Sequence, residues 1–92
     1  MIAQYVVVRG RVQGVGYRFA MADAAAEANV KGWVRNRDDG TVEAHIQGDP
    51  EAVSRVVAWC RRGPPAARVG AVDVTEAQID SSLEDFAIRG NA

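Results

Sequence analysis

A glycine-rich segment near the start of the chain could bind a small anion. The segment Gly10–Arg18, with the sequence GRVQGVGYR, joins a β-like run to a helix-like run. At such a junction the first N–H groups of the helix lack partners, and the helix dipole adds positive potential. Gly14 and Gly16 let the backbone curl, so that several N–H groups can converge on one point. No Gly-Lys-Ser/Thr sequence follows, so the pattern predicts an anion cradle other than a Walker loop.

Arg18 places a cation at the end of a helix that favours anions. The dipole and the free N–H groups already make this end positive, so an isolated arginine in the first turn is unfavourable there. A bound anion would remove the conflict, and the planar guanidinium suits two oxygens of one phosphate group. The alternative is an exposed Arg18 that bends away into solvent, because a short glycine motif alone is weak evidence.

Asn36 lies at the end of a second segment, Gly32–Arg37, just before the turn-forming sequence Asp38-Asp39-Gly40. Asparagine is common beside turns because its side chain can hydrogen-bond to nearby backbone, so turn chemistry is the simplest interpretation of Asn36 alone. Only its pairing with the loop before Arg18 makes it a candidate site residue.

The sequence predicts seven elements that would position these residues. β-branched runs bounded by polar or glycine-containing breaks indicate strands, and the Asp-Gly pair suits a tight hairpin. Alanine-rich composition favours the first helix, while Asp49 as a cap, Pro50 as the first residue and the Gly63-Pro64-Pro65 stop favour the second. In chain order, the expected elements are the strand Ile2–Val12, the helix Tyr17–Asn29, the strands Gly32–Arg37 and Thr41–Gln47, the helix Pro50–Arg62, and the strands Ala71–Ile79 and Asp85–Arg89.

Side-chain periodicity predicts which faces are buried. The first strand carries apolar residues on both faces, which indicates a central strand. Each helix shows apolar residues at helical spacing. We expect His45 to share a solvated face with Glu43 and Gln47, because these residues alternate with apolar ones. The expected core positions are Val6 and Val8 in the first strand, Phe19, Ala22, Ala26 and Val30 in the first helix, and Val53, Val56, Val57 and Cys60 in the second, with Trp33, Trp59 and Phe86 as packing residues.

The order β, α, β, β, α, β with a short extra C-terminal strand predicts an α+β fold. Two helices would pack on one face of an antiparallel sheet, the ferredoxin-like α/β sandwich. A chain of 92 residues can bury one core and is too short for two, so we expect a single domain over residues 1–92. The fold alone does not give the function.

Composition excludes several classes of function. The 11 basic side chains are balanced by 12 acidic ones, for a formal net charge of −1, so the overall charge does not favour nucleic acid or an anionic membrane. Cys60 is the only cysteine, which rules out an internal disulfide and a cysteine-rich metal site. The first apolar run is interrupted by Arg9 and Arg11 and has no basic leader, unlike a signal peptide. We therefore expect a cytoplasmic protein.

Five segments together resemble the acylphosphatase family in order and spacing. They are GRVQGVGYR (10–18), GWVRN (32–36), DGTVEAHIQG (39–48), GPPAARV (63–69) and FAIRG (86–90). The resemblance implies a ferredoxin-like sandwich that hydrolyses acyl phosphates to carboxylate and phosphate, with no cofactor and no metal. It also implies that Arg18 binds the phosphate and that Asn36 orients the attacking water. The backbone N–H groups of Gln13, Gly14, Val15, Gly16 and Tyr17 would form the cradle.

The implied chemistry needs few protein groups. The leaving group of an acyl phosphate is a carboxylate, a stable anion, so no protein acid has to protonate it. Phosphoryl transfer depends mostly on positioning and charge stabilisation. We expect Asn36 to position water for direct attack, with the water's proton passing to solvent or to a substrate phosphate oxygen. This route involves no enzyme–phosphate intermediate, and inorganic phosphate or sulfate should compete with the substrate.

Two other functions remain possible at this point. Ferredoxin-like domains include RNA binders, but those display aromatic residues on central strands, and Thr41–Gln47 has none. The second alternative is a catalytically degenerate binding module, such as a domain of this fold joined to a larger protein. Because the chain is short and matches the family over nearly all of its length, we expect a free, monomeric enzyme. Multiple turnover would distinguish it from a binding module.

Overall fold

The seven predicted elements are present in the predicted order. The structure is a computed structural model that describes all residues from 1 to 92. β4 begins at Arg68, before the expected start at Ala71, because β1 is long enough to pair with it as far as Arg11. The elements are β1 (Ile2–Arg11), α1 (Tyr17–Ala28), β2 (Lys31–Asn36), β3 (Val42–Gly48), α2 (Pro50–Arg62), β4 (Arg68–Ala77) and β5 (Phe86–Ile88).

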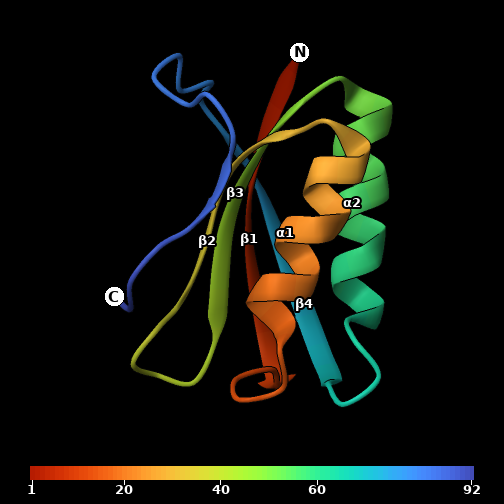
Figure 1. Cartoon of the computed structure of the whole chain (residues 1–92), viewed down its shortest axis with the longest axis vertical. Coiled ribbons are helices and arrows are strands. Elements are labelled where there is room, and N and C mark those ends of the chain that lie inside the picture. Colours follow the sequence, from red (N-terminus) through yellow and green to blue (C-terminus); the bar gives the residue numbers. More distant parts are fainter.

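The strands form one sheet in the order β4-β1-β3-β2-β5. The pairs β1–β3, β1–β4 and β2–β3 are antiparallel, as expected for the ferredoxin-like fold. β5 pairs with β2 in parallel, so the short extra strand makes the sheet mixed. Both helices lie on one face of the sheet (Figure 1). Neither helix is long and apolar enough to cross a membrane.

The core lies between the sheet and the helices. Val6 and Val8 of β1 point into it and are fully buried. The predicted face of α2 is confirmed, because Val53, Val56, Val57 and Cys60 are all buried. Asp49 stands at the N-cap of α2 as expected, but its side chain makes no capping hydrogen bond. Burial of apolar side chains from both layers therefore holds the helices on the sheet.

Of the residues expected on the buried face of the first helix, only Val30, which follows α1, is buried, so the predicted face of α1 itself was wrong. Phe19 is 66% exposed, and the helix instead buries Tyr17, Met21 and Ala25. Tyr17 sets this rotation: its hydroxyl donates a 2.8 Å hydrogen bond to the carbonyl oxygen of Cys60, and its ring centroid lies 5.2 Å from that of Trp59. One aromatic side chain at the first position of α1 thus fixes which side of an alanine-rich helix meets the core.

The prediction that His45, Glu43 and Gln47 lie on a solvated face was also wrong. They are only 8%, 5% and 3% exposed, although they point to the side of the sheet that has no helices. Side chains from neighbouring elements cover them. The His45 ring stacks on Trp33, and its Nε2 lies 2.8 Å from the Gln47 Oε1. Gln47 in turn exchanges two hydrogen bonds with the backbone of Asp80, which holds the segment after β4 against this face.

Candidate active site

The β1–α1 loop presents a row of backbone N–H groups without partners. From Gln13 to Phe19, no backbone N–H donates a hydrogen bond within the chain, and the N–H of Ala20 is the first to find an acceptor, the carbonyl oxygen of Gly16. Gly14 and Gly16 have φ angles of 74° and 77°, the left-handed region that glycine adopts at little cost. A Cβ atom at either glycine would meet nothing within 4 Å, so it is the backbone angle that requires glycine. The loop has the free donors that an anion cradle needs.

Arg18 is the second residue of α1, directly beside this loop. Its side chain is half-buried and forms neither a hydrogen bond nor an ion pair with another residue. The first turn of α1 contains no acidic residue, so nothing in the helix offsets the positive charge at its N-terminus. The structure therefore leaves the guanidinium of Arg18 available to an external anion.

Asn36 is the last residue of β2 and lies on its buried side. The residue is 8% exposed, and its side-chain Oδ1 is buried without any hydrogen-bond partner. Leaving a buried polar atom unpaired costs about 1–3 kcal/mol, so such atoms are rare unless they have a function. The Asn36 side chain does not stabilise the turn, because it forms no hydrogen bond with a turn residue. Its Oδ1 therefore keeps an unused hydrogen-bond acceptor at the end of β2.

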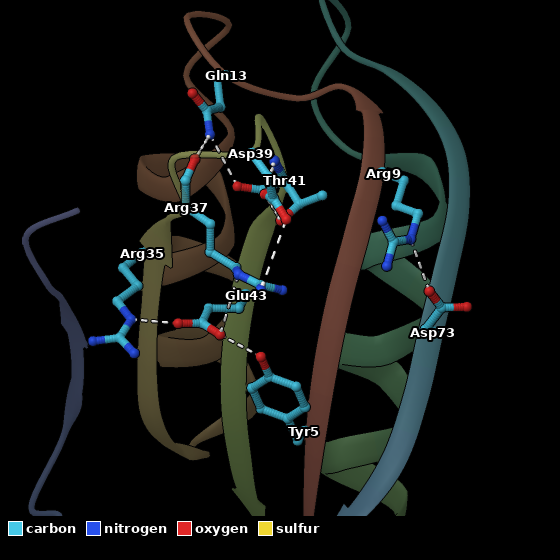
Figure 2. Close-up of polar contacts among 9 residues, drawn as sticks. All are labelled: Tyr5, Arg9, Gln13, Arg35, Arg37, Asp39, Thr41, Glu43 and Asp73. Carbon is cyan, nitrogen blue, oxygen red and sulfur yellow. Dashed lines mark hydrogen bonds and ion pairs between the residues drawn. The ribbon is translucent and has the colours of Figure 1, made fainter. Parts of the chain in front are cut away.

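The Gln13 side chain connects the loop to the end of β2. Its Nε2 donates to the carbonyl oxygens of Arg37, at 2.8 Å, and Thr41, at 2.9 Å (Figure 2). Arg37 follows Asn36 directly, so this bridge holds the loop against the strand end that carries Asn36. The β1–α1 loop and the β2–β3 turn lie at the same end of the molecule (Figure 1). The sequence analysis assigned Gln13 a backbone role only and missed its side chain.

The turn between β2 and β3 is the hairpin predicted from its Asp-Gly pair. Gly40 has a φ of 89°, and its N–H donates to the carbonyl oxygen of Arg37. The Oδ1 of Asp39 accepts hydrogen bonds from the Thr41 hydroxyl and from the Thr41 N–H, at 2.6 and 3.0 Å. These hydrogen bonds hold the pKa of Asp39 below its ordinary value. A well-ordered turn thus follows Asn36.

A buried carboxylate anchors the residues on both sides of Asn36. Glu43 of β3 accepts hydrogen bonds from the Tyr5 hydroxyl and from Nε of Arg35, and Nε of Arg37 lies 3.9 Å from its Oε2 (Figure 2). Burial by itself would raise the pKa of Glu43, but the hydrogen bonds from Tyr5 and Arg35 and the charges of both arginines outweigh it and hold the pKa below its usual value. This cluster could not be predicted from sequence, because Tyr5, Arg35 and Glu43 lie on three different strands.

We expect Glu43 to make the stability of the fold depend on acidic pH. Its pKa is below the ordinary value of 4.5 in the folded chain, so its contribution is complete above that value and is lost as the pH falls through the lowered, folded-state pKa. Urea unfolding of the wild type and Glu43→Gln should therefore differ by about 1–3 kcal/mol near neutral pH. The difference should shrink as the pH falls below 4.5, and a difference that is constant with pH would contradict this role.

Fold and site together define a class of protein. It is a small α+β sandwich that carries a loop of unpartnered backbone N–H groups, an unpaired arginine and a buried, unpaired amide oxygen at one end of the sheet. The family model described as Acylphosphatase matches residues 4–88 of the chain. The chain belongs to the acylphosphatase family.

Individual relatives agree with this assignment. An acylphosphatase of Methylococcus capsulatus is 50% identical over 84 residues, which cover 91% of this chain and 91% of that protein. The crystal structure of acylphosphatase from Bacillus subtilis superimposes with a TM-score of 0.92 at 36% identity, covering 97% of this chain and 99% of that one. The same fold also forms 12% of full-length HypF, with a TM-score of 0.89 and 26% identity. The expectation of an acylphosphatase, an enzyme that acts on small acyl phosphates, is confirmed.

Proposed function

We propose that Arg18 and the backbone N–H groups of Gln13, Gly14, Val15, Gly16 and Tyr17 hold the phosphoryl group of the acyl phosphate, and that Asn36 positions the water that attacks it. The observation that carries the proposal is the buried Oδ1 of Asn36, which has no partner in the chain. A small rotation of the Asn36 amide toward the loop would let this oxygen accept a hydrogen bond from the attacking water. The Gln13 bridge supports the pairing, because it holds the cradle against the end of β2.

The phosphoryl group has a net negative charge that the cradle and Arg18 can stabilise without proton transfer. Donors that are already in place at the developing charge need no reorganisation during the reaction. The departing carboxylate needs no acid, and an amide cannot serve as a base near neutral pH. The proton of the water therefore passes to solvent or to a phosphate oxygen of the substrate itself.

Direct attack by water also fits the placement of the nucleophilic side chains. Cys60 is fully buried in the core, and burial raises the pKa of its thiol to about 11. His45 lies on the opposite side of the sheet from the helices and is bonded to Gln47. Neither side chain is exposed toward the loop to accept a phosphoryl group. The proposed reaction is a single displacement at phosphorus.

Hydrolysis of benzoyl phosphate in water enriched in oxygen-18, with EDTA present, tests this mechanism. We expect multiple turnovers, with the label in the phosphate product and not in benzoate, because water attacks phosphorus. The reaction should also leave no phosphorylated protein when quenched in acid and examined by mass spectrometry. Label in the benzoate, or a phosphorylated residue formed and consumed at the rate of turnover, would refute direct attack.

Inorganic phosphate and sulfate should inhibit by occupying the same cradle. We infer further that the 92 residues act as one domain, as a monomer in the cytoplasm, and that they bind neither nucleic acid nor membrane. The open face of the sheet supports the exclusion of RNA. Tyr5 and Trp33 on this face are already engaged: the Tyr5 hydroxyl bonds to Glu43, and the guanidinium groups of Arg35 and Arg89 lie 4.9 and 5.0 Å from the ring centre of Trp33.

A further inference from the structure

The Gln13 side chain uses both N–H bonds of one amide group to connect two parts of the proposed site. Its Nε2 lies 2.8 Å from the Arg37 carbonyl oxygen and 2.9 Å from the Thr41 carbonyl oxygen. We propose that Gln13 is a positioning residue that fixes the distance between the phosphate cradle and Asn36. The inference rests on the proposed roles of the cradle and Asn36 and adds the group that keeps them in register.

The position of Gln13 in the chain makes it suited to this role. Its own backbone N–H belongs to the cradle, where it has no partner within the chain. Its side-chain amide ends on the carbonyl oxygen of the residue that follows Asn36. A single residue therefore contacts both parts: its main chain faces the phosphoryl group, and its side chain holds the strand end that carries the water-positioning amide.

The acceptors of the Gln13 amide are the residues that close the hairpin. Arg37 and Thr41 flank the β2–β3 turn, and the Arg37 N–H donates a 2.8 Å hydrogen bond to the Thr41 carbonyl oxygen. Gln13 adds its two hydrogen bonds to this closing pair from outside the hairpin (Figure 2). Two donors on one rigid amide plane restrain the hairpin more than a single hydrogen bond does. The hairpin has no other polar side-chain contact with the loop.

Loss of this bridge should affect catalysis more than binding. A displacement of about 1 Å between a bound phosphoryl group and the attacking water lowers a rate by about 10²-fold. The cradle itself, with Arg18 and the glycine angles, stays in place without the bridge, so affinity for phosphate should persist. A purely structural residue would instead weaken phosphate binding and rate together, or change neither.

The test is a mutant cycle on kcat and on inhibition by inorganic phosphate. Gln13→Ala should lower kcat for benzoyl phosphate by about 10- to 100-fold, while the phosphate inhibition constant changes by less than about threefold. In the Asn36→Ala background the same substitution should lower kcat by less than about threefold, because there is no longer a water-positioning group to misplace. Gln13→Met, which is similar in size, has no N–H donors and adds no charge, should behave like Gln13→Ala.

Arg9→Gln is the matched control. It removes the exposed ion pair between Arg9 of β1 and Asp73 of β4, and neither side chain forms a hydrogen bond with the loop or the hairpin, so kcat should be unchanged. A wild-type kcat in Gln13→Ala and Gln13→Met would overturn the inference. So would an equal loss of kcat with and without Asn36, or phosphate binding that weakens in parallel with kcat. Failure of the proposed function would give a different result, because the single variant Asn36→Ala would then keep the wild-type kcat.

Discussion

Arg18→Ala should lower kcat/KM for benzoyl phosphate by about 10³-fold and should weaken inhibition by phosphate as well. Removing a preorganised donor or cation from a phosphoryl-transfer site costs about 10²- to 10⁵-fold in rate. Arg18 should stabilise both the bound substrate and the transition state. Its guanidinium forms no hydrogen bond or ion pair within the chain, so it can bind the phosphoryl oxygens before and during the reaction. A group that binds substrate and transition state alike raises affinity, and the extra charge of the transition state adds to the rate.

Steady-state kinetics with phosphate as a competitive inhibitor checks this expectation. Arg55→Ala is a matched control, because it removes the same charge from the surface of α2, between the two helices. Arg18→Lys should recover part of the activity, since an ammonium keeps the charge without the planar fork. If Arg18→Ala retained normal inhibition by phosphate, the phosphoryl group would not be held by Arg18.

Asn36→Ala should lower kcat by about 10²- to 10³-fold and leave inhibition by phosphate nearly unchanged. The reason is that Oδ1 of Asn36 is expected to contact the water and not the phosphoryl group. The same substitution removes a buried oxygen that has no partner in the chain. Such an atom lowers stability, so its loss should not destabilise the fold, and the thermal midpoint should stay the same or rise.

Kinetics and thermal unfolding of Asn36→Ala and Asn36→Asp provide the measurement. Asn36→Asp keeps the oxygen but adds a negative charge close to a bound anion, so phosphate inhibition should weaken in this variant alone. A large loss of phosphate binding in Asn36→Ala would mean that the roles of Asn36 and Arg18 are exchanged. A lower thermal midpoint would mean that Asn36 has a structural partner.

The sequence predicted the elements that carry the site because their signals are local. The Asp-Gly pair of the hairpin, the Pro50 start and Gly63 stop of α2, and the glycines of the β1–α1 loop each act through their own backbone angles. The sequence did not predict the rotation of α1. Alanines lie on all sides of this helix, so spacing could not distinguish the face that contains Phe19 from the face that contains Tyr17.

The contacts around Asn36 could not be predicted for a different reason. Glu43 is buried by Tyr5, Arg35 and Arg37, which reach it only after three strands have paired in register. Similarly, the Gln13 amide meets a carbonyl oxygen 24 residues further along the chain. The alternation of apolar and polar residues along one strand indicates which side of the sheet a residue faces. It does not indicate whether side chains of the neighbouring strands are long enough to cover that residue.

In the proposed site, the loop from Gln13 to Phe19 would recognise its ligand with backbone N–H groups, which every amino acid except proline possesses. Ordinary mutagenesis can remove Arg18 or Asn36, but no substitution among the natural residues other than proline deletes a single N–H group. The individual contribution of each cradle donor is therefore accessible only by chemical synthesis, in which one amide bond is replaced by an ester. At 92 residues the chain is short enough for ligation of synthetic peptides. Apart from Gln13, Tyr17 and Arg18, whose side chains have roles of their own, the residues of this loop could change while the glycine angles persist, so the proposed anion site would depend mainly on the shape of the backbone.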